Sequence, residues 1–134
     1  NPSAKDVREA KWLLIDTLMH DFPFESRADK ANALALPLEM LVRDMIDGPV
    51  PMHLFRANLS RTGKSKLARA LCSIPMRQNP VARGFKDGKE LDKELMSALR
   101  ETPPVLFLDN IKVVIDSATL ELLVTEPRAG ARLI

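Results

Sequence analysis

The feature that most constrains this chain is the triplet Gly63-Lys64-Ser65, which lies between an apolar stretch and an amphipathic one. Residues 50–57 are apolar enough to predict a β-strand, and Leu67 and Leu71 recur downstream at helical spacing. A loop that joins a strand to a helix directs backbone N–H groups and the positive end of the helix dipole toward one point. The triplet therefore predicts a binding site for an anion such as a phosphate group.

The triplet matches the end of the phosphate-binding P-loop pattern G-x-x-x-x-G-K-[ST], but the first glycine of that pattern and the additional glycine of a common variant are both replaced. Asn58 stands at the first glycine, and Arg61 stands at the additional glycine of the G-x-x-G-x-G-K variant. Glycine tolerates backbone conformations that arginine does not, whereas asparagine tolerates left-handed conformations better than most residues. Two interpretations of Arg61 stay open: it distorts the loop, or its guanidinium lies over the phosphates.

Composition excludes several classes of protein. The 134 residues suffice for one domain with a sizeable core, and 46% apolar with 28% charged residues is typical of a globular rather than a disordered chain. No apolar run approaches the ~20 residues of a membrane span, and the first residues lack the apolar region of a secretion signal. Cys72 is the only cysteine and cannot form an internal disulfide. We therefore expect a cytoplasmic protein with no membrane partner.

The charges are distributed unevenly along the chain. Residues 1–54 carry 6 basic and 9 acidic side chains, whereas residues 55–100 carry 11 basic and 4 acidic ones. A basic block around the triplet favours binding of a triphosphate, of nucleic acid, or of both. Solvated helix faces are an equally good explanation of the same charges.

Periodicity predicts an α/β protein. We expect an N-terminal helical segment over residues 1–48 and a core over residues 49–134. The expected helices cover residues 4–20, 27–45, 64–74, 88–101 and 118–124, and Pro37 is expected to kink the second one or to divide it into two abutting helices. The expected strands cover 50–57, 105–108 and the short edge segment 81–82. Helices that alternate with apolar strands indicate a three-layer α/β sandwich with a mainly parallel sheet. Ligands of such sheets bind at the carboxyl ends of the strands.

A nucleotide site can be assembled from two of those strand ends. Lys64 would contact the β- and γ-phosphate oxygens, and the backbone N–H groups of Thr62, Gly63, Lys64 and Ser65 would surround the β-phosphate. Ser65 and Asp109, which follows the apolar residues 105–108, would hold Mg²⁺. The expected ligands are thus ATP and Mg²⁺. A capped turn and a strand-ending aspartate that coincide by chance are the less favoured alternative.

Asp109 and Asn110 are the candidate catalytic residues. In the wider AAA+ pattern of P-loop ATPases, the strand that bears the metal-binding aspartate often ends in Asp-Glu. The glutamate of that pair polarises the attacking water. Asn110 stands at the position of that glutamate. An asparagine can orient a water molecule but cannot accept its proton. Nucleotide binding is therefore better supported than hydrolysis.

Other polar side chains give weaker signals. Arg128 and Arg132 follow the last expected helix, where an arginine finger or a DNA contact could lie, although solvated loop arginines are the favoured interpretation. His20 and His53 have no partner at metal-ligand spacing, so we interpret neither as a ligand. We expect Cys72 to pack in the core.

Four stretches in this order resemble a family of P-loop ATPases. They are Asp21-Phe22-Pro23-Phe24, residues 28–35 (ADKANALA), residues 42–51 (VRDMIDGPVP) and residues 62–68 (TGKSKLA). Further matches are residues 89–93, the strand that ends at Asp109-Asn110, Asp116-Ser117 and Arg132-Leu133. Members of the family are AAA+-like or helicase-like, are encoded by bacteriophages and integrated mobile elements, and are often fused or adjacent to primase modules. The resemblance covers the chain from about residue 10 onward.

The resemblance implies an ATP-dependent role in replication of mobile-element DNA, as a ring-forming homo-oligomer or as the partner of a primase. Its loop normally carries Gly-Thr-Gly-Lys, from which Asn58 and Arg61 depart, whereas the ending Asp109-Asn110 is similar to the family's own. The family continues beyond residue 133 into another core strand, so the resemblance also implies an incomplete core. The alternative function is a non-catalytic module that binds nucleic acid or a protein partner through its basic residues 56–100.

Overall fold

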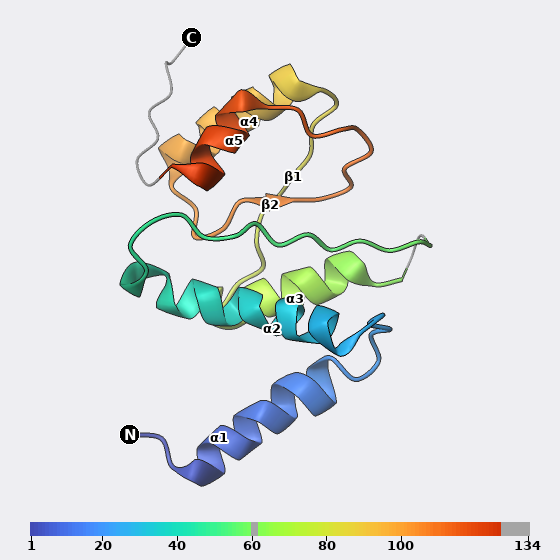
Figure 1. The fold of residues 1–134 in the computed structure, drawn as a ribbon, viewed down its shortest axis with the longest axis vertical. Coiled ribbons are helices and arrows are strands. Elements are labelled where there is room, and N and C mark those ends of the chain that lie inside the picture. The colour runs from blue at the N-terminus through green and yellow to red at the C-terminus, as the bar shows by residue number, and fades with distance from the viewer. Residues whose placement is uncertain (60–61, 127–134) are drawn as a thin grey trace.

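The computed structural model describes residues 1–59 and 62–126, which form a mostly helical arrangement (Figure 1). The helical elements are α1 (Ala4–Lys11), the π-helix η1 (Trp12–Leu18), α2 (Arg27–Val42), the 3₁₀ turn η2 (Arg43–Met45), α3 (Lys64–Met76), α4 (Gly88–Glu101) and α5 (Ala118–Thr125). The strands are β1 (Ala82–Arg83) and β2 (Phe107–Leu108). No helix in the described ranges is both long enough and apolar enough to cross a membrane.

Local capping explains where most of these helices begin. Ser26 accepts a hydrogen bond from the backbone N–H of Asp29, Asp87 from that of Glu90, and Ser117 from that of Leu120. Each cap satisfies one of the N–H groups that a helix leaves without an internal partner at its start. The predicted helix starts at these three positions are confirmed. Of the two predictions for Pro37, separate abutting helices are wrong, because α2 is continuous through that residue.

The predicted three-layer α/β sandwich is wrong. Within the described residues the sheet consists of two short strands, in which Ala82 pairs with Phe107 and Arg83 with Leu108 in parallel. Residues 50–57 were expected to form a strand, but their extended backbone joins no sheet. This segment and residues 104–113 line the same cavity, and among the described residues no strand pairing joins them. Pro51 also removes a backbone donor from the segment.

The two strands lie between two groups of helices. Figure 1 shows α2 and α3 on one side of β1 and β2, with α4 and α5 on the other side. Successive side chains of a strand point to opposite faces, so Phe107 packs with the core of α2 and α3, whereas Leu108 packs with that of α4 and α5. The first core contains the fully buried Leu71 and the second contains the fully buried Leu91. The short strand β2 therefore joins the two cores.

Two apolar residues that continue the helical spacing of core residues are partly exposed. Ile74 of α3 is 41% exposed and Leu99 of α4 is 45% exposed. Helix α3 also includes Pro75 and ends at Met76, two residues later than predicted. Each helix buries a narrower face than its apolar spacing suggested, because only one neighbouring core covers it.

Candidate phosphate and metal site

Gly63 begins the candidate site in a conformation that other residues avoid. It is the N-cap of α3, with a φ of 83° in the left-handed region. A Cβ atom at this position would lie 3.1 Å from Cε1 of Phe22. A side chain would therefore add both backbone strain and a close contact. Gly63 places Lys64 as the first residue of α3, at the positive end of the helix dipole.

The structure brings Ser65 and Asp109 together, although they are 44 residues apart in the sequence. The Ser65 hydroxyl donates a hydrogen bond of 2.8 Å to Oδ1 of Asp109. The backbone N–H of Asp109 donates to the carbonyl of Arg83 over 3.0 Å, which continues the pairing of β2 with β1. The end of β2 thus holds the carboxylate against the first turn of α3.

Arg69 completes the surroundings of the carboxylate and was missed by the sequence analysis. Its Nη2 atom donates to Oδ2 of Asp109 over 3.1 Å. Its guanidinium carbon lies 5.2 Å from the centroid of the Phe107 ring, which is within cation–π range. Arg69 lies four residues after Ser65, so both project from the same face of α3. That spacing is the sequence signal that could have identified it.

Asn110 contacts Asp109 through its backbone. Its N–H donates to Oδ1 of Asp109 over 2.8 Å, and its φ of 58° lies in the left-handed region that asparagine tolerates. Among the groups around Asp109, the Ser65 hydroxyl contributes most to lowering the pKa of this carboxyl below its ordinary value. Partial burial opposes the shift, while Arg69 and the Asn110 N–H reinforce it. Asp109 is therefore a carboxylate at neutral pH.

A cavity of about 920 Å³ opens beside these residues and is bounded by residues 49–59 and 104–113. Lys64, Ser65, Asp109 and Asn110 lie along its wall. The rest of the lining is largely apolar and comes from the helices: Leu36, Met40, Ala68, Cys72, Leu120, Leu123 and Val124. The polar site thus occupies one part of a larger cavity.

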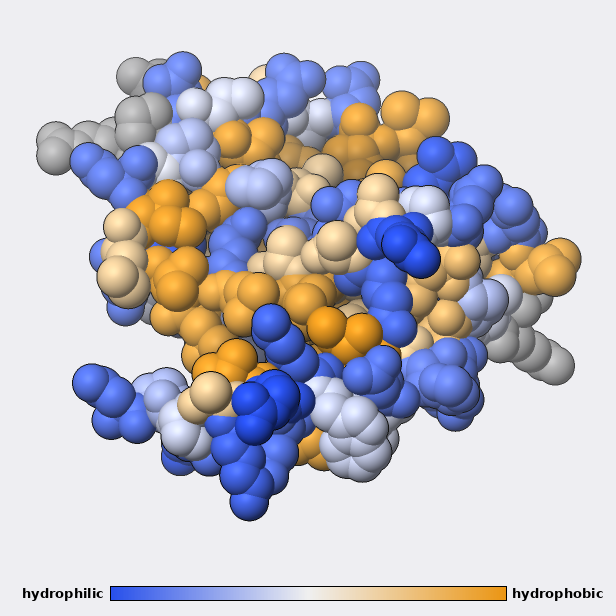
Figure 2. All heavy atoms as spheres, turned by 60° about the horizontal axis from the view of Figure 1, so that its bottom comes forward, coloured by the Kyte–Doolittle hydropathy of each residue, from blue (hydrophilic) through white to orange (hydrophobic). Residues whose placement is uncertain are grey.

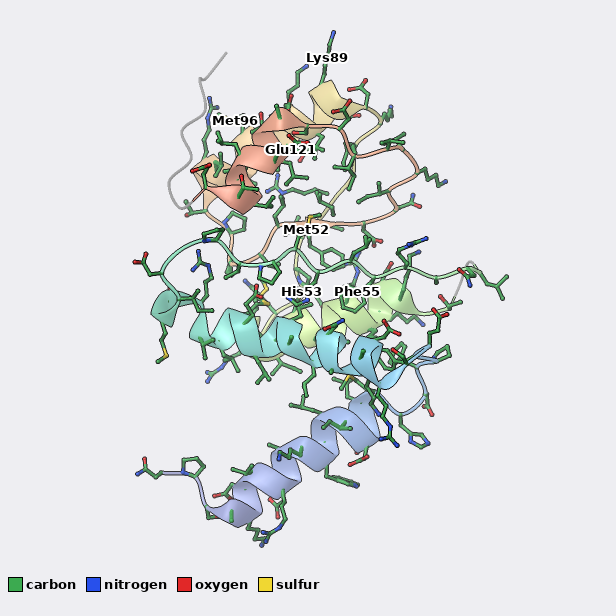
Figure 3. The ribbon with its side chains drawn as sticks, in the orientation of Figure 1. Met52, His53, Phe55, Lys89, Met96 and Glu121 are labelled. Atoms are coloured by element: carbon green, nitrogen blue, oxygen red, sulfur yellow. The ribbon has the colours of Figure 1, made fainter. Side chains whose placement is uncertain are left out.

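The extended segment 49–59 is fixed by side chains that point toward α2 and α3. Figure 3 shows His53 and Phe55 on that side, with Met52 on the opposite side. Nε2 of His53 lies 3.3 Å from a carboxylate oxygen of Glu39 in α2, and Phe55 packs against the core of α2 and α3. The residues that precede the candidate loop are therefore held in place without a strand partner.

The remaining predicted residues divide into described and undescribed positions. Thr62 is half-buried beside Gly63, and Asn58 is exposed on the cavity wall. Arg61, Arg128 and Arg132 lie outside the described residues. Nowhere in the described ranges do three His, Cys, Asp or Glu side chains gather at a metal site. A metal ion here would depend on the Ser65 hydroxyl, the Asp109 carboxylate and oxygens of a bound ligand, a donor set that suits Mg²⁺.

Comparisons with known proteins do not assign this site to a family. No family model matches the chain, and neither a curated protein nor a solved structure matches it. The functional assignment therefore rests on the geometry of Gly63, Lys64, Ser65 and Asp109.

Proposed function

We propose that this protein binds ATP with Mg²⁺ at the start of α3. The observation that carries the proposal is the 2.8 Å hydrogen bond between Ser65 and Asp109, next to a helix that begins at a left-handed glycine. The glycine exposes the N–H groups of the first turn, which suit a phosphate. The serine and the aspartate supply the oxygen atoms that Mg²⁺ prefers.

Each residue has a distinct part in the proposed complex. Lys64, which is exposed, contributes a positive charge to the phosphates, and the N–H groups of residues 62–65 donate to phosphate oxygens. Ser65 donates its hydroxyl hydrogen to Asp109, so the lone pairs of its oxygen are available to a cation. Mg²⁺ usually binds through one or two protein ligands together with substrate phosphates, which matches this small donor set.

The residues of the site support binding of ATP better than its hydrolysis. Asp109 would position the metal ion, and Asn110 could orient a water molecule but could not take its proton. Among the described residues that line the cavity, the only carboxylate besides Asp109 is Glu39, which lies 3.3 Å from Nε2 of His53. We therefore expect ATP turnover by the isolated chain to be slow relative to nucleotide binding.

Calorimetry with ATP and MgCl₂ tests the proposal. We expect Lys64→Ala to remove measurable binding and Ser65→Ala to remove most of the dependence of affinity on Mg²⁺. Lys66→Ala is the matched control, because Lys66 is an exposed lysine of the same helix turn and is absent from the cavity wall. Absence of binding to the wild-type protein at millimolar ATP would refute the proposed function.

The resemblance to phage and mobile-element ATPases suggests the biological setting. We propose that the protein acts in the cytoplasm in replication of mobile-element DNA, with a primase-type protein or further copies of itself as partners. Figure 2 shows a band of hydrophobic side chains on one face, bordered by hydrophilic ones. Exposed apolar residues of α1, η1 and α2 include Val7, Trp12, Leu13, Leu38 and Leu41. Light scattering with and without MgATP would test self-association.

The second candidate is a binding module that needs no nucleotide. The basic excess over residues 55–100 favours it, but two of these arginines already have acidic partners. Arg69 pairs with Asp109, and Arg83 pairs with Glu94 and Glu101. Binding to single-stranded DNA that falls steeply with salt and does not change with ATP would favour this module over the first proposal.

A further inference from the structure

We propose that Arg69 is a built-in counter-ion of Asp109, which a metal ion must displace when nucleotide binds. This inference rests on the proposed function, since it concerns how that site is loaded. It predicts that the metal ion enters with the nucleotide and binds poorly by itself. In the free protein, the Arg69 guanidinium is hydrogen-bonded to a carboxylate oxygen of Asp109 that the metal ion requires.

The contacts of the carboxylate carry this inference. Oδ1 of Asp109 accepts hydrogen bonds from Ser65 and from the Asn110 N–H, each 2.8 Å long. Oδ2 accepts from Nη2 of Arg69 over 3.1 Å. Both oxygens are therefore engaged before any cation arrives. A cation that approaches Oδ2 competes directly with the guanidinium.

The position of Arg69 allows such an exchange. The side chain is 36% exposed and that of Asp109 is 23% exposed, so water and ions can reach the pair. Phe107, which is nearly buried, lies under the guanidinium with 5.2 Å between the ring centroid and Cζ. A partly exposed pair of this kind is weak enough to be exchanged, and the ring gives the displaced guanidinium a second contact.

The net charge of the site leads to two opposite effects of Arg69. Lys64 and Arg69 bring two positive charges, whereas Asp109 brings one negative charge. This balance attracts metal-free ATP, which is highly anionic, and repels a free divalent cation. Loss of the Arg69 charge should therefore strengthen binding of a metal ion alone and weaken binding of ATP without metal. A residue with only a structural role would not move the two affinities in opposite directions.

The test uses the full chain and the variant Arg69→Gln, which keeps polar atoms of similar reach but removes the charge. Binding of Mn²⁺ alone is measured by water proton relaxation, and binding of ATP in EDTA is measured by calorimetry. We expect Mn²⁺ affinity to rise roughly fivefold and metal-free ATP affinity to fall by a similar factor, as for one partly exposed ion pair. Arg69→Lys restores the charge, so its Mn²⁺ affinity should stay close to that of the wild type.

Arg100→Gln is the control, because it removes the same charge from the exposed end of α4. It should leave both affinities unchanged, and far-UV circular dichroism should show native helix content in every variant. If Arg69→Gln binds Mn²⁺ no better than the wild type, the inference is wrong, whether or not ATP binds. If Mn²⁺ affinity rises but no variant or wild-type protein binds ATP, the counter-ion role stands and the proposed function fails.

Discussion

Substitution of Gly63 by alanine should destabilise the protein through two separate costs. The φ of 83° forces a residue with a Cβ atom into the left-handed region, which costs about 1–2 kcal/mol. The new Cβ would also lie 3.1 Å from Cε1 of Phe22, so the ring of Phe22 must move by a few tenths of an ångström. Together these costs predict that the free energy of unfolding falls by about 1–3 kcal/mol.

Other glycines of the same chain separate the two costs. Gly48 has a φ of 114°, but a Cβ there would meet nothing within 4 Å, so Gly48→Ala reports the backbone cost alone. Gly84 has an ordinary φ, and its added Cβ would lie 3.9 Å from the Asp109 carbonyl, which is normal contact. We expect Gly84→Ala to change stability by less than about 0.5 kcal/mol. Gly63→Ala and Gly48→Ala should both destabilise the protein more than Gly84→Ala does.

Urea unfolding followed by far-UV circular dichroism measures these differences, since most described residues are helical. With a urea m-value of about 2 kcal/mol/M, a loss of 2 kcal/mol lowers the midpoint by about 1 M. The reasoning fails if Gly63→Ala unfolds at the same urea concentration as Gly84→Ala.

Three further predictions follow from individual contacts. Ser117→Ala should lower stability by about 1–2 kcal/mol, because it removes the cap of α5 and the 2.6 Å hydrogen bond to Asp92; an unchanged urea midpoint would contradict this. Leu71→Ala should cost about 2–5 kcal/mol, because the side chain is completely buried in the core of α2 and α3, and a smaller loss would mean that this core is loosely packed. The pKa of Asp109 is lowered in the folded state, so its stabilisation is complete above the ordinary value of 3.8 and is lost as the pH falls through the folded pKa. Asp109→Asn should flatten the acid limb of the stability curve, and an identical acid limb in both proteins would count against this contribution.

Local signals predicted this fold better than long-range ones. The helix starts after Ser26, Asp87 and Ser117 were predicted correctly, because a cap depends on residues within one turn of sequence. Residues 50–57 were wrongly assigned to a strand because an apolar run does not specify its partner strand. In the structure this segment is held by side chains, including His53, and not by a ladder.

In the candidate site, too, local features of the sequence were predicted better than long-range contacts. The spacing of Gly63, Lys64 and Ser65 indicated a phosphate site from adjacent residues alone. The pairing of Ser65 with Asp109 was expected from the order of elements, and the structure places the two side chains in contact. Arg69 was missed because its one local signal, the four-residue spacing from Ser65, also fits a solvated helix arginine. Its partner is a carboxylate 40 residues away in the sequence.

Asp109 has a structural part as well as a proposed binding part, and the two can be separated. Its backbone extends the pairing of β2 with β1, and its side chain joins that end of β2 to Ser65 and Arg69 of α3. Asp109→Asn keeps an oxygen that can accept from Ser65 but removes the charge, whereas Asp109→Ala removes both. If Asp109→Asn loses Mg²⁺-dependent ATP binding but keeps nearly native stability, the negative charge of Asp109 serves ligand binding and not the fold. A large loss of stability in Asp109→Asn itself would instead show that the charge of the carboxylate is needed to hold β2 against α3.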